Sequence, residues 1–367
     1  MKRDLLTILV CPSCKGGLQL TTVESGNTGI GNIVLDLHGQ EEVISGVLKC
    51  GCGGLYPVIE GVPRFLNDGI NRFPGFIERH KQQLEHVREG QHFQINPAMT
   101  DGPDDYENIH RSFSQEWGLF DYDHDKTWGW TLKERKRVFL EDMNLRPQEM
   151  KSKRLLDAGC GNGTLTAALS EFGLEVLGLD LHDGLGLAYR NRSKYAKNAK
   201  EGVQFVQGNL VQPPLKEETF DLIYSSGVIH HTPRSKDAFE SLVRLTKRGG
   251  RLYVWVYGKR ALPVRMFFSC GRYLKRWLSF RSLLSVCKLL APFYQTLAAL
   301  LNGLRIMRFR LRSTREITLD LFDAFAPRYN HWHTEAEVHS WFEEHGFQNI
   351  HLSGRQKHGF GMYGDRA

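Results

Sequence analysis

From residue 154 onward, short apolar runs alternate with segments whose apolar residues recur at helical spacing. The apolar runs predict strands at 155–157, 175–180, 203–207, 220–225 and 251–257, and the segments between them predict helices at 165–172, 185–197 and 235–245. Strands separated by helices indicate a parallel sheet of the α/β class. A further helix over 334–345 should begin at a capping box formed by Thr334 and Glu337 and end at Gly346. Two last strands are expected at 347–352 and 360–363.

The first 153 residues have a different pattern. Residues 1–66 contain short apolar runs and many glycines, which predicts a small β-rich domain. Residues 67–105 are polar and contain three prolines, so we expect a linker with one short helix near 77–88. Residues 106–153 look helical and aromatic-rich. The predicted organisation is therefore a domain at 1–66, a linker at 67–105 and an α/β domain at 106–367 that carries an insertion at 259–315.

Charge is concentrated in that insertion. The chain has 367 residues, 48 Lys and Arg, 41 Asp and Glu, and a net charge of +7. Residues 259–315 hold 13 basic residues and no acid, which leaves the rest of the chain at −6. A single basic segment indicates a partner that binds at that segment. It does not indicate a protein that binds nucleic acid over its general surface. The longest uncharged stretch, 289–304, is shorter than the ~20 residues that span a bilayer, and the apolar run at 5–10 is too short for a signal peptide.

The segment LLDAGCGNG is the most informative in the chain. A strand ends at Asp157 and turns through Gly159, Gly161 and Gly163 into a helix, so the backbone can approach a ligand closely. A dinucleotide-binding turn has a related form, but a carboxylate at Asp157 would repel a pyrophosphate. It suits the ammonium group of S-adenosylmethionine. Asp180 ends the next strand, where it would bond ribose hydroxyls; tight βα turns without a ligand are the alternative.

These residues resemble the class I S-adenosylmethionine-dependent methyltransferases, in particular the branch of the ubiquinone and menaquinone C-methyltransferases. The similar segments are LLDAGCGNGTL, EVLGLDL, FDLIYSSGVIHHTP and LTKRGGRLYVWVYGK, and the resemblance covers residues 106–258 and 316–363. It implies a doubly wound, seven-stranded, mostly parallel sheet whose last strand is antiparallel. It also implies a cofactor site formed by Asp157, Gly159, Gly161, Gly163, Asp180, Leu181, Asn209, Leu210 and Ser225. The family usually has Asp where Asn209 stands.

The loop after the fourth strand carries His230 and His231 and should face the transferred methyl group, because ligands bind beyond the carboxyl ends of the strands. A neutral imidazole there can remove the acceptor's proton; the alternative is that the pair only orders the loop. Tyr329 and His333, which directly follow the insertion, are further candidates for substrate contact. The tryptophans at 117, 128 and 130 either cover the cofactor on an N-terminal helix or pack in the core.

Four of the seven cysteines form two close pairs, Cys11 with Cys14 and Cys50 with Cys52. Two such pairs, each beside glycine or proline, predict a closed tetrahedral zinc site with a structural role; four free thiols are the alternative. An odd cysteine count indicates a reducing, cytoplasmic environment. The flanking residues resemble the small zinc-ribbon proteins that activate tRNA, rRNA and protein methyltransferases as a separate subunit, here fused to the enzyme.

The basic insertion mixes Phe, Trp and Leu with Arg and Lys between residues 262 and 312. We expect a helical lid that docks on an anionic membrane or receives an acceptor with an apolar tail. A lid that packs on its own sheet, or a dimer contact, is the alternative.

We therefore expect a cytoplasmic, peripherally membrane-bound enzyme that methylates a small-molecule or lipid-linked acceptor. Two other functions stay open at this point. One is an rRNA or tRNA methyltransferase whose ribbon binds RNA, although the ribbon is not strongly basic. The other is a non-catalytic scaffold that binds the cofactor, which the intact set of loop glycines and acids argues against.

Overall fold

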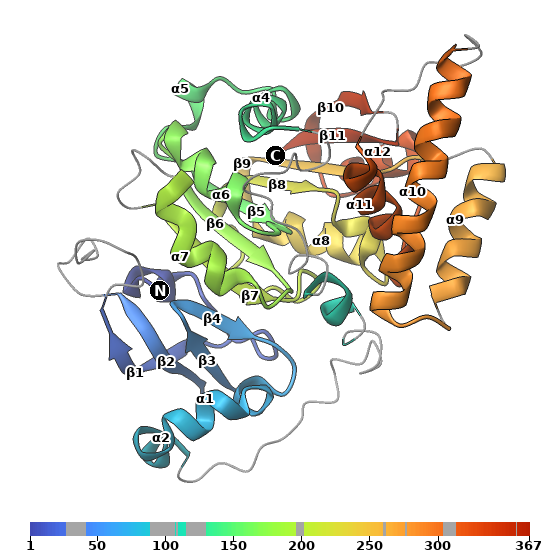
Figure 1. The fold of residues 1–367 in the computed structure, drawn as a ribbon. Coiled ribbons are helices and arrows are strands. Elements are labelled where there is room, and N and C mark those ends of the chain that lie inside the picture. Colours follow the sequence, from blue (N-terminus) through green and yellow to red (C-terminus); the bar gives the residue numbers. More distant parts are fainter. Residues whose placement is uncertain are drawn as a thin grey trace.

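The computed structural model describes residues 1–26, 42–88, 107, 109–114, 130–195, 202–259, 262–275, 277–303, 313–356 and 358–367. Within these residues, eleven strands form one sheet in the order β1-β2-β3-β4-β7-β6-β5-β8-β9-β11-β10. Figure 1 shows this sheet with helices on both faces and the N-terminal strands at one end.

The C-terminal seven strands form the predicted methyltransferase-type sheet. They are β5 (Arg154–Ala158), β6 (Glu175–Asp180), β7 (Val203–Gly208), β8 (Phe220–Ser226), β9 (Thr246–Tyr257), β10 (Phe347–Gln356) and β11 (Gly359–Arg366). Strands β7, β6, β5, β8 and β9 are parallel, and β11 pairs antiparallel with both β9 and β10. The expected fold class, including the antiparallel last strand, is therefore confirmed.

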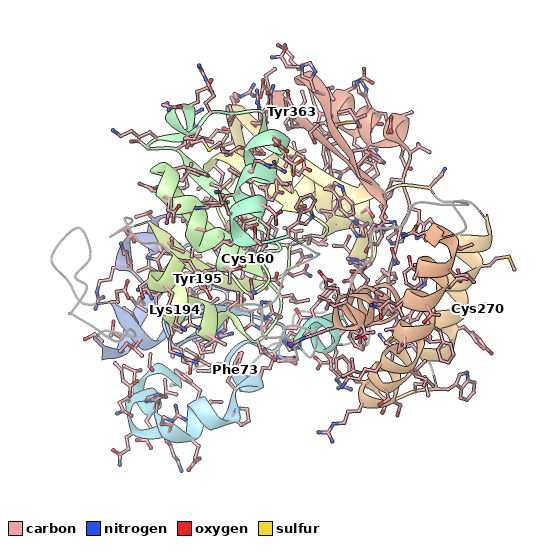
Figure 2. The ribbon with its side chains drawn as sticks, turned by 45° about the horizontal axis from the view of Figure 1, so that its top comes forward. Phe73, Cys160, Lys194, Tyr195, Cys270 and Tyr363 are labelled. Atoms are coloured by element: carbon pink, nitrogen blue, oxygen red, sulfur yellow. The ribbon has the colours of Figure 1, made fainter. Side chains whose placement is uncertain are left out.

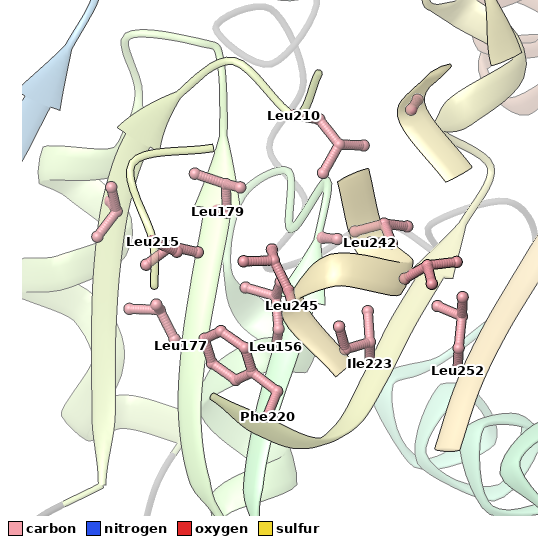
Figure 3. Close-up of a cluster of buried hydrophobic side chains, with 14 of the residues drawn as sticks. Leu156, Leu177, Leu179, Leu210, Leu215, Phe220, Ile223, Leu242, Leu245 and Leu252 are labelled. Atoms are coloured by element: carbon pink, nitrogen blue, oxygen red, sulfur yellow. The ribbon is translucent and has the colours of Figure 1, made fainter. Parts of the chain in front are cut away.

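Two layers of helices bury the two faces of this sheet. Helices α4 (Leu132–Met143), α6 (Thr164–Leu169) and α7 (Leu185–Tyr195) lie on one face, and α8 (Ser235–Leu245) and α12 (Glu335–Glu344) lie on the other (Figure 1). The short α5 (Pro147–Met150) leads into β5, and the 3-10 turn η4 (Ser170–Phe172) follows α6. Figure 3 shows the α8 side of the core, where leucines of α8 meet Leu156, Leu177 and Phe220 of the sheet.

The N-terminal domain is an antiparallel sheet stabilised by short helices. Its elements are η1 (Arg3–Thr7), β1 (Leu18–Ser25), β2 (Val43–Cys50), β3 (Leu55–Ile59), β4 (Val62–Phe65), η2 (Gly69–Arg72), α1 (Pro74–Arg79) and α2 (Lys81–Arg88). Ile70, Phe76 and Leu84 are buried against Val47 and Leu55. Residues 69–88, which the sequence placed in a polar linker with one helix, thus belong to the core of this domain.

The two domains share one sheet. Strand β4 pairs in parallel with β7, so that Arg64 lies opposite Gln207. A buried ion pair adds to this joint, because Arg192 of α7 contacts the Glu42 carboxylate at 2.7 Å. The α-amino group of Met1 is also buried and donates hydrogen bonds to the Val43 carbonyl and the Tyr189 hydroxyl. The N-terminal domain is therefore joined to the edge of the seven-stranded sheet by strand pairing, an ion pair and hydrogen bonds.

The insertion after β9 forms helices α9 (Leu262–Lys275) and α10 (Phe280–Gly303), and α11 (Thr314–Phe325) follows it. Both α9 and α10 pack on α11, at the end of the molecule far from the N-terminal domain (Figure 1). Among the described residues, α10 is the one helix long and apolar enough to cross a membrane. It is longer than the uncharged stretch at 289–304 because it also includes Arg281 and Lys288.

Candidate functional site

The glycine loop connects β5 to α6 and depends on backbone conformations that favour glycine. Gly159, Gly161 and Gly163 have φ values of +87°, +54° and +72°, which side-chain-bearing residues rarely adopt. A Cβ at Gly159 would lie 2.2 Å from a methyl group of Val228, and one at Gly163 would lie 2.6 Å from the Phe205 ring. The glycines therefore let the loop turn tightly and let the residues before the histidine pair pack directly against it.

Asp180 holds the glycine loop from the neighbouring strand. Its Oδ2 accepts a hydrogen bond from the Gly161 N–H at 2.8 Å, and its Oδ1 accepts from the Leu181 and His182 N–H groups. His182 is buried and fixes the same turn, because its Nε2 donates to the Gly161 carbonyl at 2.6 Å while its Nδ1 accepts from the Gly184 N–H. Two side chains at the end of β6 and just beyond it thus hold both backbone groups of Gly161.

Asp157 is buried where β5 ends. The Thr166 hydroxyl donates to its Oδ2 at 2.7 Å. Burial raises the pKa of the Asp157 carboxyl to about 6, because an ionised carboxylate loses its hydration there. A cation that approached this carboxylate would lower its pKa again, so the residue is suited to a positively charged ligand group.

The other predicted cofactor residues lie around the same strand ends. The Ser225 hydroxyl donates to the Ala158 carbonyl at 3.0 Å, which ties β8 to β5. Asn209 accepts a hydrogen bond from the Val211 N–H and forms the turn after β7, and the buried Leu210 follows it. Leu181 lies between Asp180 and His182, and its carbonyl accepts from the Gln207 amide at 2.9 Å. The structure therefore gathers the predicted residues of β5, β6, β7 and β8 at one edge of the sheet.

The histidine pair forms the short turn η5 (Ile229–His231) directly after β8. His231 donates from Nδ1 to the Tyr329 carbonyl at 3.0 Å, which leaves Nε2 as the unprotonated nitrogen of the neutral ring. Burial lowers the pKa of His231 to about 4 and lowers that of His230 well below its usual value. Both rings are therefore neutral at pH 7.

Four buried polar atoms at and around His230 have no hydrogen-bond partner within the described residues. They are both ring nitrogens of His230, the indole Nε1 of Trp255 and the side-chain oxygen of Asn330. The His230 ring lies 4.1 Å from the Tyr257 ring centre and 5.9 Å from that of Trp255. Because buried polar groups in proteins are almost always paired, this cluster is where a bound molecule would supply the missing partners.

Tyr329 and His333 have different surroundings. Tyr329 contributes its backbone carbonyl to His231, so it orients the imidazole through the main chain. His333 lies between α8 and α12, where Nδ1 contacts Glu337 Oε1 at 2.9 Å and Nε2 contacts the Ser235 hydroxyl at 3.0 Å. Both nitrogens of His333 are thus used to join two helices.

Residues 109–114 form a short helical segment that covers the site. His110 Nε2 contacts Asp183 Oδ1 at 2.9 Å beyond β6, and the Ser112 hydroxyl donates to the Ala326 carbonyl after α11. Between them, the Phe113 ring packs edge-on against His231, 5.8 Å away. The segment therefore bridges the cofactor side and the histidine side. Trp117 and Trp128, which the sequence placed either over the cofactor or in the core, lie outside the described residues, and Trp130 is half-buried just before α4.

The N-terminal domain reaches this region through Arg64. Its guanidinium donates to Gln207 Oε1 at 3.0 Å and to the Asp183 carbonyl at 3.2 Å, and the Gln207 amide donates to Asp183 Oδ1. Although burial opposes it, the hydrogen bonds from His110 and Gln207 hold the pKa of Asp183 well below its usual value. A cavity of about 580 Å³ lies where this domain meets Glu107 and His110.

The four predicted zinc ligands come together in the N-terminal domain. Their Sγ atoms all lie within 4.8 Å of one another, with Cys11 3.6 Å from Cys52 and Cys14 3.4 Å from Cys50. A tetrahedral zinc with Zn–S bonds of about 2.3 Å would place its sulfurs roughly 3.8 Å apart. All four are free thiols, so the donor set and its spacing fit zinc.

Three functional residues were missed from the sequence. His182 has no motif around it, and its role follows only from the turn that brings it under Gly161. Gln207 and Arg64 are joined by the pairing of two strands far apart in the chain. For Arg64, the one local signal is a charged residue within the apolar run 62–66.

Comparisons with known proteins agree with this geometry. Residues 156–254 match the methyltransferase domain family, and residues 2–61 match the Trm112p-like protein family. The chain is 30% identical over 172 residues to a methyltransferase-family protein of Encephalitozoon cuniculi, which covers 46% of this chain and 71% of that protein. These matches confirm both resemblances found in the sequence.

Other relatives match a smaller share of the chain. The sterol 24-C-methyltransferase of Pneumocystis carinii is 33% identical over 28% of each chain. The demethylmenaquinone methyltransferase of Renibacterium salmoninarum is 28% identical over 28% of this chain and 40% of its own, so the chain spans less than half the length of either relative. A solved methyltransferase of Burkholderia thailandensis, with 1,6-didemethyltoxoflavin and S-adenosylhomocysteine bound, has a TM-score of 0.43 at 15% identity over 76% of this chain and 93% of that one.

Proposed function

Because this chain belongs to the methyltransferase family, we propose that it transfers the methyl group of S-adenosylmethionine to a small-molecule acceptor. The observation that carries this proposal is the position of the unpartnered polar cluster around His230, which follows β8 directly beside the glycine loop. A donor site and an acceptor site thus adjoin at the carboxyl ends of β5, β6 and β8, where ligands bind in open α/β sheets.

The residues of the glycine loop fit the donor. Asp157 supplies a buried carboxylate for an ammonium group. Asp180 accepts three backbone N–H bonds, which leaves one lone pair on its Oδ2 for a ribose hydroxyl. When bound, S-adenosylmethionine supplies an electrophilic methyl group on a sulfonium. The chain itself holds the two reactants in line and excludes water from between them. Residues 109–114 cover the site and are placed to exclude this water.

The aromatic rings around the histidine pair fit an acceptor with an apolar ring or chain. Trp255, Tyr257 and Phe113 line this side of the site, and the unpartnered polar atoms are placed to bond a hydroxyl or amine on the acceptor. The sterol and quinone names of the relatives support an acceptor of this kind. His231 then removes the proton of the attacking group, because the Tyr329 carbonyl keeps its Nε2 unprotonated.

The test is a methyl-transfer assay on the purified full chain. Calorimetric titration should show binding of S-adenosylmethionine in preference to NAD, and hydroquinones, sterols and small amines then serve as acceptors. His231→Ala should lower kcat about a hundredfold with little change in donor affinity, since it removes a proton acceptor and no donor contact. His339→Ala, on the exposed face of α12, is the matched control and should keep full activity.

Two results would contradict the proposal. Preference for NAD would remove the methyltransferase assignment as a whole. A His231→Ala variant with unchanged kcat on a confirmed acceptor would show that the pair only orders the loop. The pH profile gives a second readout, because a base with a pKa of about 4 stays active down to pH 5 and loses activity only below that.

A further inference from the structure

The outer face of α10 exposes a continuous row of large apolar side chains. They are Leu289, Leu290, Phe293, Tyr294, Leu297 and Leu300, whose spacing places them on one side of the helix. Trp277, in the turn between α9 and α10, is 77% exposed. Nine of the eleven large apolar side chains that are exposed among the described residues lie between 266 and 300. A patch of this size on one element marks an interaction surface.

The opposite side of α10 is fixed to the protein. Leu283, Cys287 and Ala291 are buried in a cluster with Phe322 and other residues of α11. The helix is 24 residues long, and its most apolar window is only 22% buried. Because one side of residues 283–291 is packed on α11, α10 can meet an apolar phase sideways without leaving the fold. A helix that crossed the bilayer would have to give up this packing.

The charge of the insertion identifies the partner. Residues 259–315 carry 13 Lys and Arg and no acid, while the rest of the chain has a net charge of −6. Arg281 and Lys288 are exposed on α10 itself, at the N-terminal end of the apolar row. A second copy of this chain would bring the same positive charge against itself, whereas an anionic surface with an apolar interior complements both features.

We propose that the outer face of α10, together with Trp277, docks the protein sideways on an anionic lipid bilayer. Cys270 on α9 lies at the same outer margin of the molecule (Figure 2). The docking face is one helix away from the acceptor site, because Asp323 of α11 accepts a hydrogen bond from the Tyr257 hydroxyl at 3.0 Å. Docking itself does not depend on methyl transfer.

Vesicle flotation with the full chain tests the proposal. The probes are phosphatidylcholine vesicles with and without phosphatidylglycerol. Binding should require the anionic lipid and weaken as salt is raised, because salt screens the attraction. Leu297→Asp should weaken binding by about tenfold or more, since it removes a leucine from the apolar phase. The pair Arg281→Glu and Lys288→Glu should weaken it by at least about 25-fold, at roughly fivefold for each of the two positive charges lost, because the two new carboxylates are also repelled by the anionic lipid.

Matched controls separate docking from general surface effects. Leu187 on α7 has the same exposed fraction as Leu297, 55% against 54%, so Leu187→Asp should leave binding unchanged. Lys133 on α4 is exposed, and Lys133→Glu is the control for charge reversal. All of these positions are exposed, so circular dichroism should confirm that the variants fold.

Three outcomes would overturn the docking proposal. One is no flotation of the wild-type protein with anionic vesicles at low salt. Another is equal binding to neutral and anionic vesicles. The third is a wild-type dimer, seen by analytical ultracentrifugation, that Leu297→Asp converts to a monomer while vesicle binding is absent, because a second copy then covers the face. None of these outcomes affects the methyl-transfer assay with water-soluble acceptors, so the two proposals can fail separately.

Discussion

At the scale of single residues, the site depends on charges that the fold keeps out of water. Asp157 is the clearest case, because its carboxylate is buried and accepts a hydrogen bond from Thr166. Burial raises its pKa to about 6, so the native chain binds more protons than the unfolded chain between roughly pH 4 and pH 6. The free energy of unfolding should therefore fall as pH rises through this window. A cation bound beside Asp157 would stabilise its ionised carboxylate and so oppose this loss of stability.

This property predicts a pH-dependent affinity for the methyl donor. Between pH 5 and pH 7 the donor's ammonium stays charged, while Asp157 goes from about a tenth ionised to mostly ionised. Isothermal titration should therefore show about tenfold tighter binding at pH 7 than at pH 5. Asp157→Asn should bind more weakly at pH 7 and lose this dependence. A wild-type affinity that does not change with pH would exclude an ion pair at Asp157.

The residues of the site that could be predicted from the sequence are those that lie within short motifs. The acids that end β5 and β6, the loop glycines and the four cysteines could all be located, because each is tied to a local pattern of strand, turn and spacing. His182 could not be found in this way, since its contact with Gly161 depends on how two neighbouring turns pack. His333 was singled out by composition, but the structure uses its two nitrogens to join α8 and α12.

At the scale of elements, the helix caps were the most predictable feature. The Thr334 hydroxyl accepts from the Glu337 N–H, and the Glu337 carboxylate accepts from the Thr334 N–H, as the sequence predicted. Strand ends were less predictable. Strand β9 begins at Thr246 and not near 251, because residues 247–250 form an irregularity opposite Asp221 that contains Gly249 at φ +73°. From the sequence alone, such a glycine indicates a turn, so the first residues of β9 were not predicted as part of the strand.

Replacement of the cap at α12 should lower stability measurably. Thr334→Ala removes the acceptor for the Glu337 N–H and should cost about 1 kcal/mol in the free energy of unfolding. Urea unfolding followed by circular dichroism measures this as a lower midpoint. Thr334→Ser keeps the hydroxyl and should restore most of the stability. An equal loss in both variants would show that the threonine methyl group, and not the cap, carries the effect.

At the scale of the whole molecule, the two domains form one folding unit. The largest core cluster contains Cys11, Cys50 and Phe65 of the N-terminal domain together with Leu177 and Ile223 of the catalytic sheet. The pairing of β4 with β7 could not be predicted, because the run 62–65 predicts a short strand but gives no information on a partner some 140 residues later. Arg64 and Gln207 connect this strand pairing to the loop after β6, because Arg64 donates a hydrogen bond to Gln207 and Gln207 donates one to the Leu181 carbonyl.

Removal of zinc should therefore affect the catalytic domain as well as the N-terminal domain. Zinc binding at four thiolates stabilises small domains strongly, and here two of the ligands lie in the shared core. Chelation under reducing conditions should lower the Tm of the full chain by roughly 6 °C, if some 5 kcal/mol of stability is lost at about 1.3 °C per kcal/mol for a folding unit of 367 residues. It should also weaken binding of S-adenosylmethionine, because Arg64 loses its position beside Asp183.

Cys270→Ser, which changes an exposed thiol on α9, is the control and should leave both values unchanged. If calorimetry instead shows the N-terminal domain melting alone, with donor affinity intact, then the shared sheet does not couple the two domains.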